Sequence, residues 1–94
     1  MKRLPLDNVL TLDELMALRQ QFKSENRIVV FTNGVFDIIH PGHVAYLTEA
    51  KELGSVLIVG LNSDESVKML DKGTNRPIQN EDARAVVLSA LKPV

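Results

Sequence analysis

The sequence predicts one α/β domain, spanning residues 1–94, in which helices flank a parallel sheet. Two short apolar segments, 28–32 and 55–61, are rich in β-branched residues and are predicted to be strands. The second does not alternate apolar and polar residues, as expected for a parallel strand covered on both faces. The chain between the two segments carries apolar residues at helical spacing, so the predicted order is strand, helix, strand, which is a βαβ unit.

A first helix is predicted over about 12–24, before the first strand. Thr11 and Glu14 have the spacing of a capping box, in which each residue binds the backbone of the other. The apolar residues that follow at helical spacing are Leu12, Leu15, Met16 (or Leu18) and Phe22.

The second helix is predicted to begin at Pro41 or Gly42 and to end at Leu53. Gly54 stands where a left-handed residue would terminate it. The residues expected to face the core are Val44, Leu47 and Ala50.

After the second strand, the turn 62–64 is predicted to open a short helix that ends near Leu70, followed by a polar loop over 71–77. Asn80 is predicted to cap a last helix, with Glu81 and Asp82 in the first turn, where the helix dipole favours acidic residues. The buried face of this helix is predicted to contain Val86, Val87, Ala90 and Leu91.

Composition excludes several classes of function. Hydrophobic residues make up 45% and charged residues 24% of the chain, which is ordinary for a globular protein and not for a disordered one. A formal net charge of −1 provides no basic field for nucleic acid, and the lack of cysteine excludes disulfides and thiolate metal sites. The longest apolar run, Val56–Leu61, is too short to span a membrane, and no signal segment follows the N-terminus. We expect a cytoplasmic protein without nucleic-acid or membrane partners.

The chemistry is expected in two loops, 32–43 and 62–64, because ligands of open α/β sheets bind beyond the carboxyl ends of the strands. In the first loop, Gly34 and Gly42 let the backbone approach a ligand closely. The start of the second helix offers unpaired N–H groups that favour phosphate. His40 and His43, the only histidines of the chain, flank Gly42 and can donate ring N–H groups to phosphate oxygens. The alternative is a plain turn with two surface histidines.

The segment 32–43, Thr-Asn-Gly-Val-Phe-Asp-Ile-Ile-His-Pro-Gly-His, resembles the signature G-x-F-D-x-x-H-x-G-H of the cytidylyltransferase-like nucleotidyltransferases. Within that superfamily, three further segments resemble the bacterial heptose 1-phosphate adenylyltransferases. They are 57–68, which is similar to their second strand and following helix, 75–78, which is similar to their G-R-P-V loop, and 82–91, which is similar to an arginine-bearing helix.

The resemblance implies a Rossmann-like (HUP-type) fold and the transfer of AMP from ATP to a sugar 1-phosphate, with Mg²⁺ accompanying ATP. The product would be an ADP-heptose, a precursor of lipopolysaccharide. The implied catalytic residues, which would hold the triphosphate, are His40 and His43. No metal site of the protein's own is implied. The residues implied to frame the nucleotide are Thr32, Asn33, Gly34, Val35, Phe36 and Gly42.

Further candidates for substrate contacts are Asp37, Asn62, Asp64, Lys68, Arg76 and Arg84. Each has an alternative reading. Asp37 orients its loop or contacts the acceptor, and the two residues of the 62–64 turn meet a substrate or serve as turn and cap. The basic residues at 68 and 76 reach phosphate or remain solvated. Arg84 forms an internal ion pair or contacts substrate.

The family fold continues beyond the point where this sequence ends, so the chain is expected to hold an incomplete half of that fold. Two strands are too few for a stable open sheet, so we expect a homo-oligomer that shares the edge of Val56–Leu61. Other acceptors used with this fold are glycerol phosphate, phosphopantetheine and nicotinate nucleotide. The alternatives to an enzyme are a non-catalytic nucleotide-binding module and an interaction domain with a vestigial turn.

Overall fold

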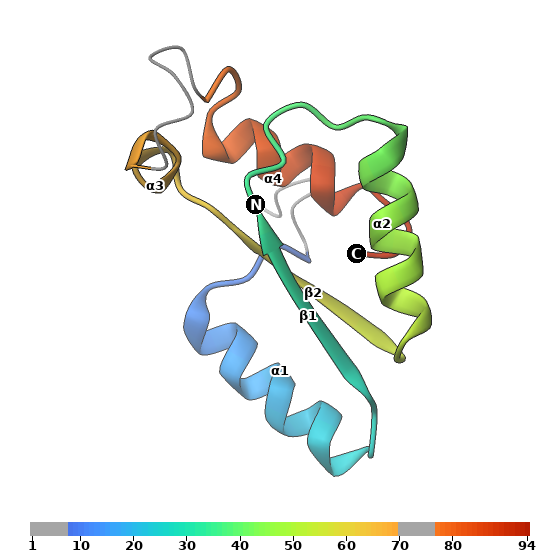
Figure 1. Cartoon of the computed structure of the whole chain (residues 1–94). Helices are drawn as coiled ribbons and strands as arrows, with labels where there is room; N and C mark the ends of the chain where they lie inside the picture. Colours follow the sequence, from blue (N-terminus) through green and yellow to red (C-terminus); the bar gives the residue numbers. More distant parts are fainter. Residues whose placement is uncertain (1–7, 70–76) are drawn as a thin grey trace.

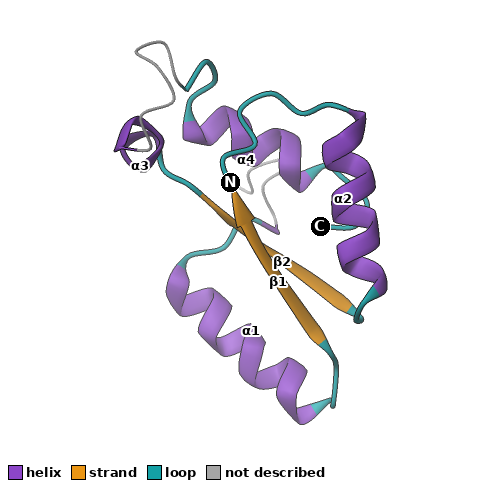
Figure 2. Cartoon of the chain, viewed as in Figure 1, coloured by secondary structure: helices purple, strands orange, loops and turns teal. Residues whose placement is uncertain are grey.

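The computed structural model describes residues 8–69 and 77–94. Its elements, in chain order, are α1 (Leu12–Ser24), β1 (Val29–Gly34), α2 (Pro41–Glu52), β2 (Val56–Leu61), α3 (Asp64–Met69) and α4 (Glu81–Ser89). The two strands pair in parallel and α2 connects them, so the predicted α/β class and the βαβ unit are confirmed (Figure 1, Figure 2).

Strand β1 is longer than predicted. The parallel register runs from Val29 opposite Val56 to Gly34 opposite Leu61, and the N–H of Asn62 donates to the carbonyl of Gly34 at 3.0 Å. The predicted end at residue 32 was therefore wrong. Asparagine and glycine are rare in strands, so the composition of the sequence concealed the last two residues of β1.

The core lies between one face of the sheet and the helices α2 and α4, and α1 lies on the other side of the strands (Figure 1). Of the three α2 residues predicted to face the core, Leu47 is completely buried and Ala50 packs against the core cluster, whereas Val44 is exposed, so that part of the prediction was wrong. The core cluster consists of Phe36, Leu47, Leu57 and Leu88.

Both predicted helix caps are confirmed. In α1, the N–H of Glu14 donates to Thr11 Oγ1 at 3.2 Å, and the N–H of Thr11 donates to Glu14 Oε1 at 2.8 Å. In α4, the N–H of Ala83 donates to Asn80 Oδ1 at 2.7 Å. These caps satisfy backbone groups that the first turn of a helix cannot pair internally.

The predicted buried face of α4 was wrong in part. Arg84 and Leu88 are its buried residues, whereas Val87 is exposed. An arginine is rarely buried completely unless it is paired, so a prediction from apolar residues places it on the surface. The predicted buried face of α4 was therefore rotated away from Arg84.

Gly54 has a different role from the one predicted. Helix α2 ends with a right-handed Leu53 as its C-cap, and Gly54 is not left-handed. A Cβ atom at this glycine would lie 2.6 Å from the carbonyl oxygen of Ile28. The position therefore requires glycine because the chain passes close to the start of β1.

Candidate functional site

The two histidines cap the first turn of α2. His40 is the N-cap, in extended conformation, and its Nδ1 accepts the N–H of Gly42 at 3.0 Å. In return, the N–H of His40 donates to Nδ1 of His43 at 3.1 Å. This is a capping box in which two imidazoles take the places usually held by a hydroxyl and a carboxylate.

These hydrogen bonds determine where each ring carries its proton. A neutral imidazole has one nitrogen that accepts and one that donates. Because Nδ1 accepts in both rings, the proton of each lies on Nε2. The ring centroids of His40 and His43 are 3.9 Å apart with an angle of 35° between the planes. The turn therefore presents two neighbouring Nε2–H donors.

The same contacts occupy the backbone donors that were expected to bind phosphate. Pro41 has no N–H, Gly42 donates to the His40 ring, and the N–H of His43 donates to the carbonyl of His40 at 2.9 Å. The expectation of unpaired N–H groups at this helix start was therefore wrong.

The two glycines make room for side chains of the same turn. A Cβ atom on Gly42 would lie 2.7 Å from Cε1 of His40, and one on Gly34 would lie 2.8 Å from Cε2 of Phe36. Contacts below 3.0 Å force a neighbour to move, so a side chain at either glycine would displace an aromatic ring of the site.

Phe36 and Asp37 are buried residues whose contacts restrain the loop before the histidine turn. Phe36 is buried with a φ of 50°, which is unusual for a bulky residue, and its ring meets that of His43 edge to face at 5.5 Å. Asp37 is also buried, and its carboxylate accepts the N–H groups of Ile78 and Gln79, each at 2.8 Å. Of the two roles considered for Asp37, these contacts favour orientation of the loop.

A cleft of about 500 Å³ opens beside the turn, at the end of the strands where the sequence predicted the site. It brings together five of the predicted residues and two that were missed, Ile38 and Val67. Both are apolar, and no motif marked them. The residues that line the cleft are Val35, Phe36, Asp37, Ile38, His40, His43 and Val67.

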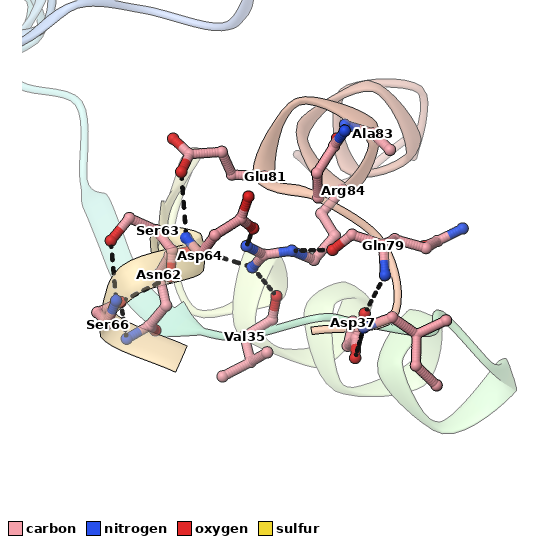
Figure 3. Close-up of polar contacts among 12 residues, drawn as sticks. Val35, Asp37, Asn62, Ser63, Asp64, Ser66, Gln79, Glu81, Ala83 and Arg84 are labelled. Carbon is pink, nitrogen blue, oxygen red and sulfur yellow. Dashed lines mark hydrogen bonds and ion pairs between the residues drawn. The ribbon is translucent and has the colours of Figure 1, made fainter. Parts of the chain in front are cut away.

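Arg84 is completely buried behind the cleft, where it joins the ends of both strands (Figure 3). Its Nη1 donates to the carbonyls of Val35 and Asn62, both at 2.8 Å. Nη2 pairs with Asp64 Oδ1 at 2.7 Å, and Nε donates to the carbonyl of Gln79 at 3.1 Å. These contacts favour the internal ion pair over a substrate contact.

The other predicted residues lie outside the cleft lining. Thr32 Oγ1 is hydrogen-bonded to the hydroxyl of Tyr46 at 2.7 Å, and Asn33 is an exposed residue of β1. Asn62 Nδ2 donates to Ser66 Oγ at 3.3 Å, and the turn that contains Asp64 is tied to Arg84. Lys68 is exposed on α3, and the prediction for Arg76 falls outside the described residues.

Within residues 8–69 and 77–94, no group of three or more histidine or acidic side chains is arranged to hold a metal ion. Over the same ranges, no helix has both the length and the apolar character needed to cross a membrane.

The pKa of His43 is lowered, first by burial of its ring and then by the nearby His40. The unfolded chain, with an ordinary pKa of 6.5, therefore binds a proton more readily than the folded chain does. We predict that uncharged His43 makes its full contribution to the free energy of unfolding above pH 6.5. This contribution is lost as the pH falls through the lowered pKa of His43.

Urea unfolding between about pH 5 and pH 8 measures this effect. His43→Asn is the control, because Oδ1 of asparagine can accept the N–H of His40 in place of Nδ1 without titrating. The wild type should lose more stability than this variant on acidification. Equal losses would contradict the prediction.

A family model described as Cytidylyltransferase-like matches residues 31–94. Among curated proteins, the "Bifunctional protein HldE" of Wolinella succinogenes is 51% identical over 88 residues, which are 94% of this chain and 18% of that protein. The protein of the same name from Campylobacter jejuni is 56% identical over 79 residues, which are 84% of this chain and 16% of that protein. The chain thus spans less than a fifth of the length of these relatives.

Among solved structures, the lipopolysaccharide core biosynthesis protein from Thermoplasma volcanium superimposes with a TM-score of 0.67. The two sequences are 41% identical, and the match covers 72% of this chain and 53% of that one.

Proposed function

The chain belongs to the cytidylyltransferase-like family of nucleotidyltransferases, and we propose that it transfers AMP from ATP to a sugar 1-phosphate, with heptose 1-phosphate as the acceptor. The observation that carries this proposal is the double histidine cap, in which both Nδ1 atoms accept backbone N–H groups and both Nε2–H groups remain as donors. Both rings line the cleft of about 500 Å³.

In the proposed reaction, a phosphate oxygen of the acceptor attacks the α-phosphorus of ATP. The bond from this phosphorus to the bridging oxygen breaks, and pyrophosphate leaves with the electron pair. The attacking phosphate is already largely ionised near neutral pH, so no general base is required. Positioning and electrostatic stabilisation dominate such transfers. The Nε2–H groups of His40 and His43 supply both by donating to the phosphate oxygens on which negative charge grows.

The donor set fits a triphosphate, since imidazole N–H groups can donate hydrogen bonds to phosphate oxygens. Mg²⁺ would enter with ATP and neutralise charge on its oxygens. The ligands of the ion would include phosphate oxygens of ATP and several water molecules.

The choice of a sugar phosphate rests on two kinds of similarity. Residues 57–68 and 75–78 resemble segments of the heptose 1-phosphate adenylyltransferases. The similar solved structure is described as a lipopolysaccharide core biosynthesis protein.

The test is release of pyrophosphate from ATP and Mg²⁺ with a panel of acceptors. We expect release with heptose 1-phosphate and none with glycerol phosphate, phosphopantetheine or nicotinate nucleotide. Release with one of the others alone would replace the proposed acceptor. Binding of ATP without release for any acceptor would favour the non-catalytic nucleotide-binding module instead.

We further propose that the chain acts in the cytoplasm, where ATP and sugar phosphates are available, and that it forms a homo-oligomer. A groove of about 770 Å³ follows β2 and is walled by apolar residues of α1 and α4. Val56–Leu61 is apolar throughout, yet only Leu57 in it is buried. A second copy that pairs with this edge would cover it and enlarge the sheet. Sedimentation of a folded monomer at micromolar concentration would contradict the association.

A further inference from the structure

Phe36 occupies a position that its own conformational preference opposes. Its φ of 50° places a bulky residue in the left-handed region, and its side chain is buried. Such a conformation persists only when the surrounding structure holds it, and it occurs often at functional sites. The contacts that hold Phe36 in this conformation therefore indicate which part of the site depends on it.

The residues on both sides of Phe36 are tied to one point in the loop before α4 (Figure 3). On one side, the carbonyl of Val35 accepts Nη1 of Arg84 at 2.8 Å, and Nε of the same guanidinium donates to the carbonyl of Gln79 at 3.1 Å. On the other side, the carboxylate of Asp37 accepts the N–H of Gln79 at 2.8 Å. The network forms a closed circuit that begins and ends next to Phe36.

The circuit is also fixed to the second strand. Arg84 Nη1 reaches the carbonyl of Asn62 at 2.8 Å, and Nη2 pairs with Asp64 Oδ1 at 2.7 Å. Lysine cannot reproduce these contacts, since its ammonium is a point charge whereas the planar guanidinium reaches several acceptors at once. Shape as well as charge is therefore required at position 84.

Phe36 transmits this restraint to the histidines. Its ring meets the ring of His43 at 5.5 Å between centroids, with the planes 64° apart. His43 Nδ1 in turn accepts the N–H of His40. A shift of Phe36 would thus release His43, and the release of His43 would free one half of the double cap.

We propose that Arg84 and Asp37 are positioning residues for the phosphate site, which act through Phe36 to hold the imidazole of His43 in the Nε2–H tautomer. Neither residue needs to touch substrate for this role. The proposal rests on the proposed function, because it assigns a purpose to the tautomer that phosphate binding uses.

The test compares Arg84→Lys and Asp37→Asn with Arg27→Lys, a control at an exposed arginine that is remote from the cleft lining. Imidazole ¹⁵N spectra report the tautomers directly, and only two histidines contribute signals. Isothermal titration with ATP and Mg²⁺ gives Kd. In both test variants we expect averaged tautomer signals from His43 and a Kd raised roughly tenfold, by analogy with the loss on removing an outer-shell partner of a metal-binding histidine. Arg27→Lys should match the wild type.

A folded variant that keeps the single tautomer and the wild-type Kd would overturn the proposal. If Arg84→Lys does not fold, Asp37→Asn carries the test, because it preserves shape and one acceptor oxygen. Loss of folding in both would also overturn it, since the network would then be a requirement for folding. If the wild type shows the Nε2–H tautomer but binds no ATP, the proposed function is contradicted. The positioning role is then still tested by the tautomer signals of the variants.

Discussion

Replacement of His43 with alanine will lower kcat for pyrophosphate release about 10²–10³-fold, the loss typical of removing one preorganised donor from a site of developing charge. The ring supplies an Nε2–H donor, and its Nδ1 accepts the N–H of His40 at 3.1 Å. Alanine removes both functions and the edge-to-face contact with Phe36. Steady-state kinetics with ATP, Mg²⁺ and the sugar phosphate measure the effect.

His43→Asn separates the two functions of the ring. Its Oδ1 can accept the N–H of His40, so the cap survives, but no group remains at the position of Nε2. We expect its kcat to stay as low as that of the alanine variant, while its stability returns toward the wild-type value. Tyr46→Phe serves as a control, since it removes a hydrogen bond to Thr32 outside the cleft lining. A kcat for His43→Asn near that of the wild type would show that the cap, and not the donor, matters.

Replacement of Leu47 with alanine will reduce the free energy of unfolding by about 2–5 kcal/mol, because it leaves a cavity in the core. Leu47 has no exposed surface and packs with Phe36, Leu57 and Leu88, so it holds α2 against the sheet. A small domain has a total stability of only about 5–15 kcal/mol, so this loss is a large fraction of the whole.

The matched control for this change is Leu53→Ala, at the end of α2, where the side chain is 75% exposed. A surface leucine outside the core should change the free energy of unfolding by less than about 0.5 kcal/mol. Urea unfolding gives both values. Similar losses in the two variants would mean that the core does not centre on α2.

Much of this fold could be predicted from local patterns. The capping box of Thr11 and Glu14, the cap at Asn80 and the uniformly apolar strand 56–61 are each determined by a few neighbouring residues. The histidine turn could also be predicted, since glycines and a proline interrupt regular secondary structure. Local chemistry is sufficient where the partners are close in sequence.

The network around Arg84 could not be predicted in this way. Its acceptors lie as far as 49 residues away in the chain, and three of them are backbone carbonyls, which sequence does not distinguish. The same limit applies to Gly54, whose close neighbour Ile28 comes from another element. The start of α2 is a local exception, because the histidines pair with backbone N–H groups only two and three residues away, and imidazole is an uncommon capping group. Long-range backbone contacts decided the cases of Arg84 and Gly54.

The central claim is that the two Nε2–H groups of the histidine turn bind the phosphates of a nucleotide. Its most direct test is a thermal-shift titration with ATP and Mg²⁺ on the wild type and on the double variant His40→Asn, His43→Asn, in which asparagine keeps both cap acceptors. A ligand that binds only the folded state must stabilise it. The Tm of the wild type should therefore rise as the ATP concentration increases, whereas the Tm of the double variant should not change. Equal shifts in both proteins, or no shift in the wild type, would contradict the claim.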